Sequence, residues 1–284
     1  MNPELSSDVL HCGRFRVDLS VPRIMAIVNV TPDSFSGDGL GQDVGAALAR
    51  AEAAVAAGAE LLDVGGESSR PGSEAVSEQE ELDRVMPLVE RLSEWPVPVS
   101  VDTVKPGVMR AAIAVGAALI NDINAFRAPG AIEAVAASDA ALCVMHMQGQ
   151  PKTMQHAPHY DDVVGEVMHF LGERVAVLRA AGVADARMVL DPGFGFGKTL
   201  EHNLALLRDL ERLRKGGLHV LVGMSRKTML GQITGRSVEQ RVAAGVAAAL
   251  FAVERGARIV RTHDVATTRD ALAVWMALKG LRAS

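Results

Sequence analysis

The sequence predicts an α/β protein with one domain over residues 1–284, a closed (β/α)₈ barrel of the TIM-barrel class with a short N-terminal hairpin. Eight short apolar runs alternate with longer stretches of helical periodicity. The runs are continuous in hydrophobicity, as in parallel strands that are covered on both faces. Eight such units need roughly 250 residues, so the 284-residue chain leaves no material for a second domain.

The predicted strands begin near eight positions along the chain. These are Ile24, Glu60, Val97, Ala118, Ala140, Met188, His219 and Arg258. The first 20 residues, which include His11, Arg14, Phe15 and Val17, predict a hairpin that closes the bottom of the barrel. An open doubly wound sheet also alternates strands with helices, but it needs a phosphate fingerprint after its first strand, and the sequence has none there.

Capping residues predict where the intervening helices begin and end. Ser77 and Glu80 form a capping-box pattern ahead of an apolar helical face. Further helices are expected to open at Asp43, Pro106, Asp161 and Leu200. Glycines are expected to end helices ahead of the next strand at Gly58, Gly116, Gly182 and Gly256.

Composition limits the partners and the compartment. The 29 Lys and Arg residues against 34 Asp and Glu give a net charge of −5, so no broad basic surface is available for nucleic acid or an anionic membrane. No apolar run approaches the roughly 20 residues that cross a bilayer. Two cysteines and a start without a signal-peptide pattern predict a reduced, cytoplasmic protein. We therefore expect small-molecule substrates.

Polar residues follow every predicted strand. In a parallel barrel these strand ends share one mouth, where barrel enzymes place their active sites. A single aspartate at a strand end is more often a helix cap or a turn acceptor. Eight polar strand ends together indicate a binding or catalytic site.

The polar segments resemble the dihydropteroate synthase family from about residue 24 to residue 265. The segments that carry the resemblance are Asn29-Val-Thr-Pro-Asp-Ser-Phe-Ser36, Asp63-Val-Gly-Gly-Glu-Ser-Ser-Arg-Pro-Gly72, Ser100-Val-Asp-Thr103, Asn121-Asp-Ile123, Met145-His-Met-Gln-Gly149, Asp191-Pro-Gly-Phe-Gly-Phe-Gly-Lys198, Gly223-Met-Ser-Arg-Lys227 and Arg261-Thr-His-Asp-Val265. The resemblance implies a transferase that joins 6-hydroxymethyl-7,8-dihydropterin diphosphate to 4-aminobenzoate, forming 7,8-dihydropteroate and diphosphate.

The resemblance also implies which residues contact the pterin. Asp191 is expected to accept two N–H bonds from the aminopyrimidinone edge, a strong pairing for a buried carboxylate. Asn121 would serve the remaining ring edge, and Asp102 would lie near the exocyclic methylene. The alternative is structural: Asp191 could end a strand, Asn121 could join an Asx turn, and Asp102 could cap a helix.

The diphosphate requires cations and donors. By resemblance, Arg261 and His263 contact it, Asn29 is a Mg²⁺ ligand, and Ser69 donates a hydroxyl where the family usually has threonine. Mg²⁺ is thus the implied cofactor. Without the resemblance, Arg261 and His263 could equally be a surface pair.

Lys227 is similar to a family lysine that bridges the pterin and the aminobenzoate region. The remaining aminobenzoate contacts implied are Arg70, Pro71, Phe35, Phe196 and Ser225. Phe196 could instead serve loop packing. The expected catalytic residues are Asp102, Lys227, Arg261 and His263, which would stabilise departing diphosphate and a pterin methylene cation before the amine attacks. No nucleophilic Cys or Ser is expected, because Cys143 lies in an apolar strand run.

Two local patterns suggest other chemistry. Gly193 to Thr199 is similar to a phosphate-binding loop, but Pro192 stands where that motif requires glycine. His146, His156 and His159 have no tetrahedral zinc spacing, and loop polarity is favoured for them.

Other functions and an assembly remain to be distinguished. A pterin-binding methyltransferase of the same superfamily would not need Arg261 and His263, and a binding-only paralogue would be expected to lose Lys227 or Arg261. The resemblance further implies a homodimer. The final helices, residues 242–257 and 266–278, could form its interface or simply pack on the barrel.

Overall fold

The computed structural model describes residues 8–30, 40–67 and 76–281 and contains the predicted closed barrel. Neighbouring strands are parallel, in the order β10-β3-β4-β5-β6-β7-β8-β9. The eight strands are β3 (Arg23–Asn29), β4 (Leu61–Gly65), β5 (Val99–Asp102), β6 (Leu119–Asp122), β7 (Ala141–Met145), β8 (Met188–Asp191), β9 (His219–Val222) and β10 (Ala257–Thr262). The sequence thus predicted the class and the strand order.

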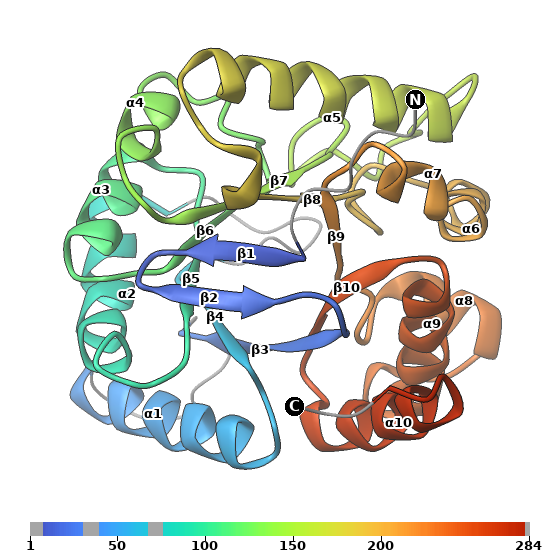
Figure 1. Ribbon diagram of the computed structural model, residues 1–284, viewed down its shortest axis with the longest axis horizontal. Helices are drawn as coiled ribbons and strands as arrows, with labels where there is room; N and C mark the ends of the chain where they lie inside the picture. The colour runs from blue at the N-terminus through green and yellow to red at the C-terminus, as the bar shows by residue number, and fades with distance from the viewer. Residues whose placement is uncertain (1–7, 31–39, 68–75, 282–284) are drawn as a thin grey trace.

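Helices surround the barrel (Figure 1). They are α1 (Leu40–Ala56), α2 (Glu78–Leu92), α3 (Pro106–Ala114), α4 (Ala131–Val135), α5 (Val163–Ala180), α6 (Leu200–Arg208), α7 (Glu211–Arg214), α8 (Thr228–Thr234), α9 (Val242–Glu254) and α10 (Val265–Leu278). Their apolar faces pack on the outer faces of the strands, as Val85, Leu88 and Val89 of α2 do. This layer is the main hydrophobic core.

The predicted N-terminal hairpin is confirmed. Strands β1 (Val9–Cys12) and β2 (Phe15–Asp18) pair in antiparallel fashion and cross one end of the barrel (Figure 1). Leu10 and Cys12 pack on side chains inside the barrel, among them Met25 and Leu119 near the amino ends of their strands. The hairpin closes this end and leaves the opposite end for the polar residues.

Most helix boundaries agree with the capping signals. Gly58, Gly116, Gly182 and Gly256 follow α1, α3, α5 and α9 with φ from +87° to +101°, a conformation that L-residues rarely adopt. The Ser77 hydroxyl accepts from the Glu80 amide at 3.1 Å, as predicted.

The predicted first residues of two helices were wrong, by two and three positions. Helix α1 begins at Leu40 rather than Asp43, and α5 begins at Val163 with Asp162 as its N-cap. The Asp162 carboxylate accepts from the Gly165 amide, and neighbouring Asp161 could not be separated from it by residue type. Across the described residues, no helix is both long and apolar enough to cross a lipid bilayer.

Candidate active site at the barrel mouth

The carboxyl ends of the strands bring the predicted polar residues to one end of the barrel. Asp102 ends β5 opposite Asn121 of β6, and Asp191 ends β8 opposite Met145 of β7. Arg261 comes from β10 and bonds to Asp102 at 3.1 Å. Four residues that are distant in sequence therefore share one site.

Arg261 is held by two carboxylates. Its Nε donates to Asp63 Oδ2 at 2.6 Å, and its Nη2 donates to Asp102 Oδ2. Although burial lowers the pKa of Arg261, Asp63 and Asp102 raise it by more, so the guanidinium stays charged. Burial raises the pKa of Asp102, Arg261 opposes the rise, and Asp63 adds to it.

Asp63 is a residue to which the sequence assigned no role. Its side chain is completely buried and also accepts from Ser100 Oγ at 2.5 Å and from Asn121 Nδ2 at 3.4 Å. A charged residue in the continuous apolar strand 61–64 was the available signal, because a buried carboxylate requires partners. Asp63 thus orients both Arg261 and Asn121.

Asn121 and Asp191 place buried acceptor oxygens at the mouth. Asn121 Oδ1 is buried and accepts no hydrogen bond from the described residues. The Gly193 amide donates a hydrogen bond to Asp191 Oδ1 at 2.7 Å. Burial raises the pKa of Asp191, whereas Lys227 lowers it. Since buried acceptors normally find donors, these two side chains suit a ligand edge that is rich in N–H groups.

The Lys227 ammonium group contacts the segment that follows β8. Its Nζ donates to the Phe194 carbonyl and lies 4.7 Å from the centre of the Phe196 ring. Burial lowers the pKa of Lys227 to about 8, and Asp191 opposes that shift. Phe196 also packs against the apolar cluster that contains Met145 and Met147. It therefore serves loop packing and, at the same time, contacts Lys227.

Ser225 and His263 follow the neighbouring strands β9 and β10 and contact each other. The His263 amide donates to Ser225 Oγ at 3.2 Å, and the imidazole Nδ1 lies 3.1 Å from the same oxygen. His263, Arg226, Arg50 and Asn29 help to line a cavity of about 480 Å³. This cavity lies between β3, α1 and the start of α10, and the residues that line it do not include Asp102, Asn121, Asp191, Lys227 or Arg261.

Asn29 ends β3, and its amide is a neutral oxygen donor of the kind that Mg²⁺ accepts. No cluster of three or more His, Cys, Asp or Glu residues with metal-ligand geometry occurs within the described ranges. The donor set there fits an ion that takes most of its ligands from a bound anion and water. Phe35, Ser69, Arg70 and Pro71 lie outside the described residues.

The remaining sequence signals have structural explanations. Cys143 is completely buried and desolvation raises its pKa, so it is a core residue as predicted. His156 is an exposed loop residue, as predicted, whereas His146 is only 6% exposed and bonds to Lys198. The interpretation of His146 as loop polarity was therefore wrong.

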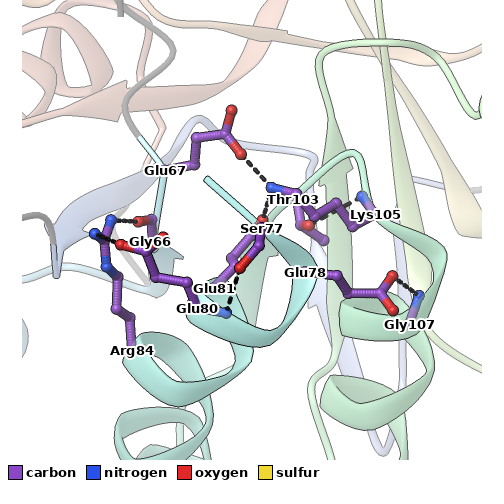
Figure 2. A network of polar contacts seen from close by, with 10 residues as sticks. All are labelled: Gly66, Glu67, Ser77, Glu78, Glu80, Glu81, Arg84, Thr103, Lys105 and Gly107. Carbon is purple, nitrogen blue, oxygen red and sulfur yellow. Dashed lines mark hydrogen bonds and ion pairs between the residues drawn. The ribbon is translucent and has the colours of Figure 1, made fainter. Parts of the chain in front are cut away.

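A polar network fixes the ends of β4 and β5 next to this site (Figure 2). Lys105 forms ion pairs with both Glu67 and the buried Glu81 of α2. Arg84 donates to the Gly66 carbonyl at 3.0 Å and pairs with Glu80. Helix α2 is thereby attached to residues 66–67 and to the residues that follow Asp102.

A family model described as a pterin binding enzyme matches residues 25–263, the stretch that contains the barrel and the polar mouth. The fold and the site thus define a pterin-binding barrel enzyme. The chain is 49% identical over 281 residues to dihydropteroate synthase of Neisseria meningitidis serogroup B, which covers 96% of this chain and 99% of the relative.

Solved structures give the same result. Xanthomonas albilineans dihydropteroate synthase with 4-aminobenzoic acid has a TM-score of 0.92 and 51% identity, over 98% of this chain and 100% of that chain. The Burkholderia cenocepacia enzyme complexed with 7,8-dihydropteroate has a TM-score of 0.88 and 53% identity, over 96% of each chain. The chain belongs to the dihydropteroate synthase family. It is a transferase that condenses 6-hydroxymethyl-7,8-dihydropterin diphosphate with 4-aminobenzoate to give 7,8-dihydropteroate and diphosphate.

Proposed function

We propose that Asp191, Asn121 and Lys227 bind the dihydropterin ring in this reaction. The supporting observation is the unpaired acceptor Asn121 Oδ1, together with the buried Asp191 carboxylate and the half-buried Lys227 ammonium group. A pterin edge carries adjacent N–H donors, which such acceptors would satisfy with charge-assisted bonds.

Arg261 and His263 are proposed to stabilise the diphosphate, with Ser69 as a further donor. The C–O bond between the pterin methylene and the diphosphate breaks, and its electron pair leaves with the diphosphate. Asp102 then stabilises the positive charge on the methylene. Because Arg261 is shared between Asp63 and Asp102, movement of the guanidinium toward the anion would leave Asp102 free for this role.

The amine of 4-aminobenzoate is proposed to attack the methylene carbon and then to lose one proton. Ser225 and Phe196 would position this substrate, together with Arg70, Pro71 and Phe35. An aniline is already a neutral nucleophile, so its orientation beside the cation is the main requirement. No covalent enzyme intermediate is needed.

Asn29 is proposed to hold Mg²⁺ through its amide oxygen, with the diphosphate supplying most of the other ligands. The ion would neutralise negative charge on the leaving group. We further propose a cytoplasmic homodimer. The exposed apolar side chains of α9 and α10, Phe251, Val274 and Leu278, support an interface there, and sedimentation of the purified protein tests the dimer.

Binding of dihydropterin diphosphate to the Asn121→Leu variant tests the proposed pterin site. We expect affinity to fall about 10-fold or more, because a ligand N–H would lose its acceptor. Unchanged affinity in a folded variant would contradict the assignment. The double change Glu211→Gln and Lys215→Met, which removes an exposed ion pair at α7, is the control and should have no effect.

A further inference from the structure

Lys198 follows the glycine-rich segment after β8 and points into the protein. Its side chain is buried, with 3% of the residue exposed. The ammonium group lies 2.9 Å from His146 Nδ1, 3.0 Å from the Gly193 carbonyl and 3.0 Å from the Phe196 carbonyl. The His146 carbonyl is a fourth, more distant acceptor at 3.4 Å, so all three N–H groups of the ammonium ion have partners. The Gly-Lys-Thr sequence therefore does not form a phosphate-binding loop.

The segment 193–197 is held by side chains, and Lys198 bonds to two of its carbonyls. Each of its five carbonyls accepts a side-chain hydrogen bond. The donors are Lys198 to Gly193, Lys227 to Phe194, Gln155 to Gly195, Lys198 to Phe196 and Tyr160 to Gly197. Loss of the Lys198 donor would leave the Gly193 and Phe196 carbonyls without this partner, and buried carbonyls without partners are costly.

Glycine is required where the segment touches β7 and the residues that follow it. Gly193 has φ +69°, and a Cβ there would lie 1.9 Å from the His146 carbonyl. Gly197 has φ +61°, and its Cβ would lie 2.3 Å from the Gln148 carbonyl. The backbone is therefore pressed against His146 and Gln148, and Lys198 bonds across that contact.

The same segment controls two residues of the pterin site. The Gly193 amide donates to the Asp191 carboxylate at 2.7 Å, and the Phe194 carbonyl accepts from Lys227. The Phe196 ring packs against the Lys227 ammonium. A displacement of the segment would thus move the partners of Asp191 and of Lys227 together.

Asp191 is the carboxylate that favours the charged form of Lys198. Burial lowers the pKa of Lys198 to about 7, Asp191 raises it, and Lys227 lowers it further. Burial and Lys198 lower the pKa of His146 to about 3, which leaves the imidazole neutral and able to accept at Nδ1.

We propose that Lys198, held by His146, is a positioning residue whose buried ammonium group orders the 193–197 segment and so orients Asp191 and Lys227 for the pterin. This inference rests on the proposed pterin site. It assigns Lys198 no contact with substrate. Its expected signature is a loss of affinity that is larger for the pterin than for 4-aminobenzoate, because Phe196 is the one residue of the segment assigned to the second substrate.

The Lys198→Met variant tests this, because methionine keeps the apolar stem and removes the charge. We expect affinity for dihydropterin diphosphate to fall about 10-fold to 100-fold, with a smaller rise in the KM for 4-aminobenzoate because Phe196 lies in the same segment. The exposed Lys215→Met variant is the control. Wild-type pterin affinity in folded Lys198→Met, or equal loss for both substrates, would overturn the inference.

Two histidine variants decide the matter if Lys198→Met does not fold. His146→Gln keeps an acceptor for the ammonium, and His146→Leu does not. Pterin affinity should be largely retained in the first and lost in the second, and equal affinities would refute the role. If Asp191→Asn loses pterin binding while all Lys198 and His146 variants keep it, the proposed function stands and only this inference fails.

Discussion

Arg261 illustrates how single residues are poised at the mouth. Its guanidinium bonds to both Asp63 and Asp102, so its charge is already oriented. With Asp63 as the fixed partner, Arg261 needs only to exchange its bond to Asp102 for one to the departing diphosphate. The orientation depends on Asp63, which is completely buried.

The Asp63→Asn variant should therefore have impaired catalysis, although Asp63 acts through Arg261 and does not itself contact substrate. The amide keeps a hydrogen-bond acceptor for Ser100 but removes the charge that faces Arg261. We expect kcat to fall about 10-fold to 100-fold, as for the loss of a charged hydrogen bond of about 1.5–3 kcal/mol. Steady-state assays measure this. Asp185→Asn, which removes an exposed partner of Arg179, is the control, and similar rates for the two variants would contradict the role.

Asp191 predicts a pH dependence of pterin binding. Burial raises the pKa of Asp191, and only the ionised form accepts two N–H bonds. Affinity for 6-hydroxymethyl-7,8-dihydropterin without its diphosphate should fall as pH decreases through that raised pKa, at most about tenfold per pH unit. Calorimetric titration of wild type and Asp191→Asn tests this, with weaker and nearly pH-independent binding expected for the variant. An equal slope in both proteins would count against Asp191.

At the scale of elements, Lys105 connects α2 to the ends of β4 and β5 (Figure 2). Lys105→Met would leave Glu81, only 1% exposed at its side chain, as a buried charge without a cation. The free energy of unfolding should decrease by about 3–5 kcal/mol, as is typical when one partner of a buried ion pair is lost. Urea unfolding measures the change.

A second substitution separates charge from packing. Adding Glu81→Gln to Lys105→Met should recover part of the lost stability, because no buried charge then remains unpaired. Lys279→Met, which breaks an exposed pair with Glu254, should cost about 1 kcal/mol or less. If Lys105→Met costs no more than Lys279→Met, the network has no stabilising role.

The strands and the helix ends could be predicted from the sequence, whereas the side-chain contacts between elements could not. Continuous apolar runs and helix-ending glycines depend on local chemistry, so strand order and most helix ends were predictable. The Lys105–Glu81 and Lys198–His146 contacts join residues 24 and 52 positions apart. Such pairs depend on how the barrel closes, and no local pattern at Lys105 or His146 identifies the partner.

The candidate site was predictable to the extent that strand ends share one mouth. That rule brought Asp102, Asn121, Asp191 and Arg261 together correctly. It could not indicate that Arg261 would face two carboxylates. Asp63 lies on β4, and β3 separates that strand from β10, which carries Arg261. The roles of these residues toward substrate remain predictions.

For the whole molecule, His146 should make stability sensitive to acid. Its pKa is lowered to about 3 by burial and Lys198, with a smaller contribution from Arg127, against an ordinary value of 6.5. Between pH 6.5 and pH 3 the unfolded chain binds more protons at His146 than the folded protein does. The free energy of unfolding therefore decreases as pH falls below 6.5, by at most about 1.4 kcal/mol per pH unit.

Urea unfolding of wild type and His146→Gln between pH 7 and pH 4.5 checks this sign. The wild-type free energy of unfolding should fall more steeply than that of the variant, because glutamine has no proton to gain. The exposed His169→Gln variant should follow wild type. A slope unchanged by His146→Gln would show that the imidazole does not resist protonation.

The most direct test of the central claim is diphosphate release by the purified protein. It would be given 6-hydroxymethyl-7,8-dihydropterin diphosphate and Mg²⁺, with and without 4-aminobenzoate. We expect diphosphate release that requires 4-aminobenzoate and is matched by an equal amount of 7,8-dihydropteroate. A folded protein that binds the pterin diphosphate but forms no dihydropteroate would contradict the claim and would indicate a binding-only paralogue.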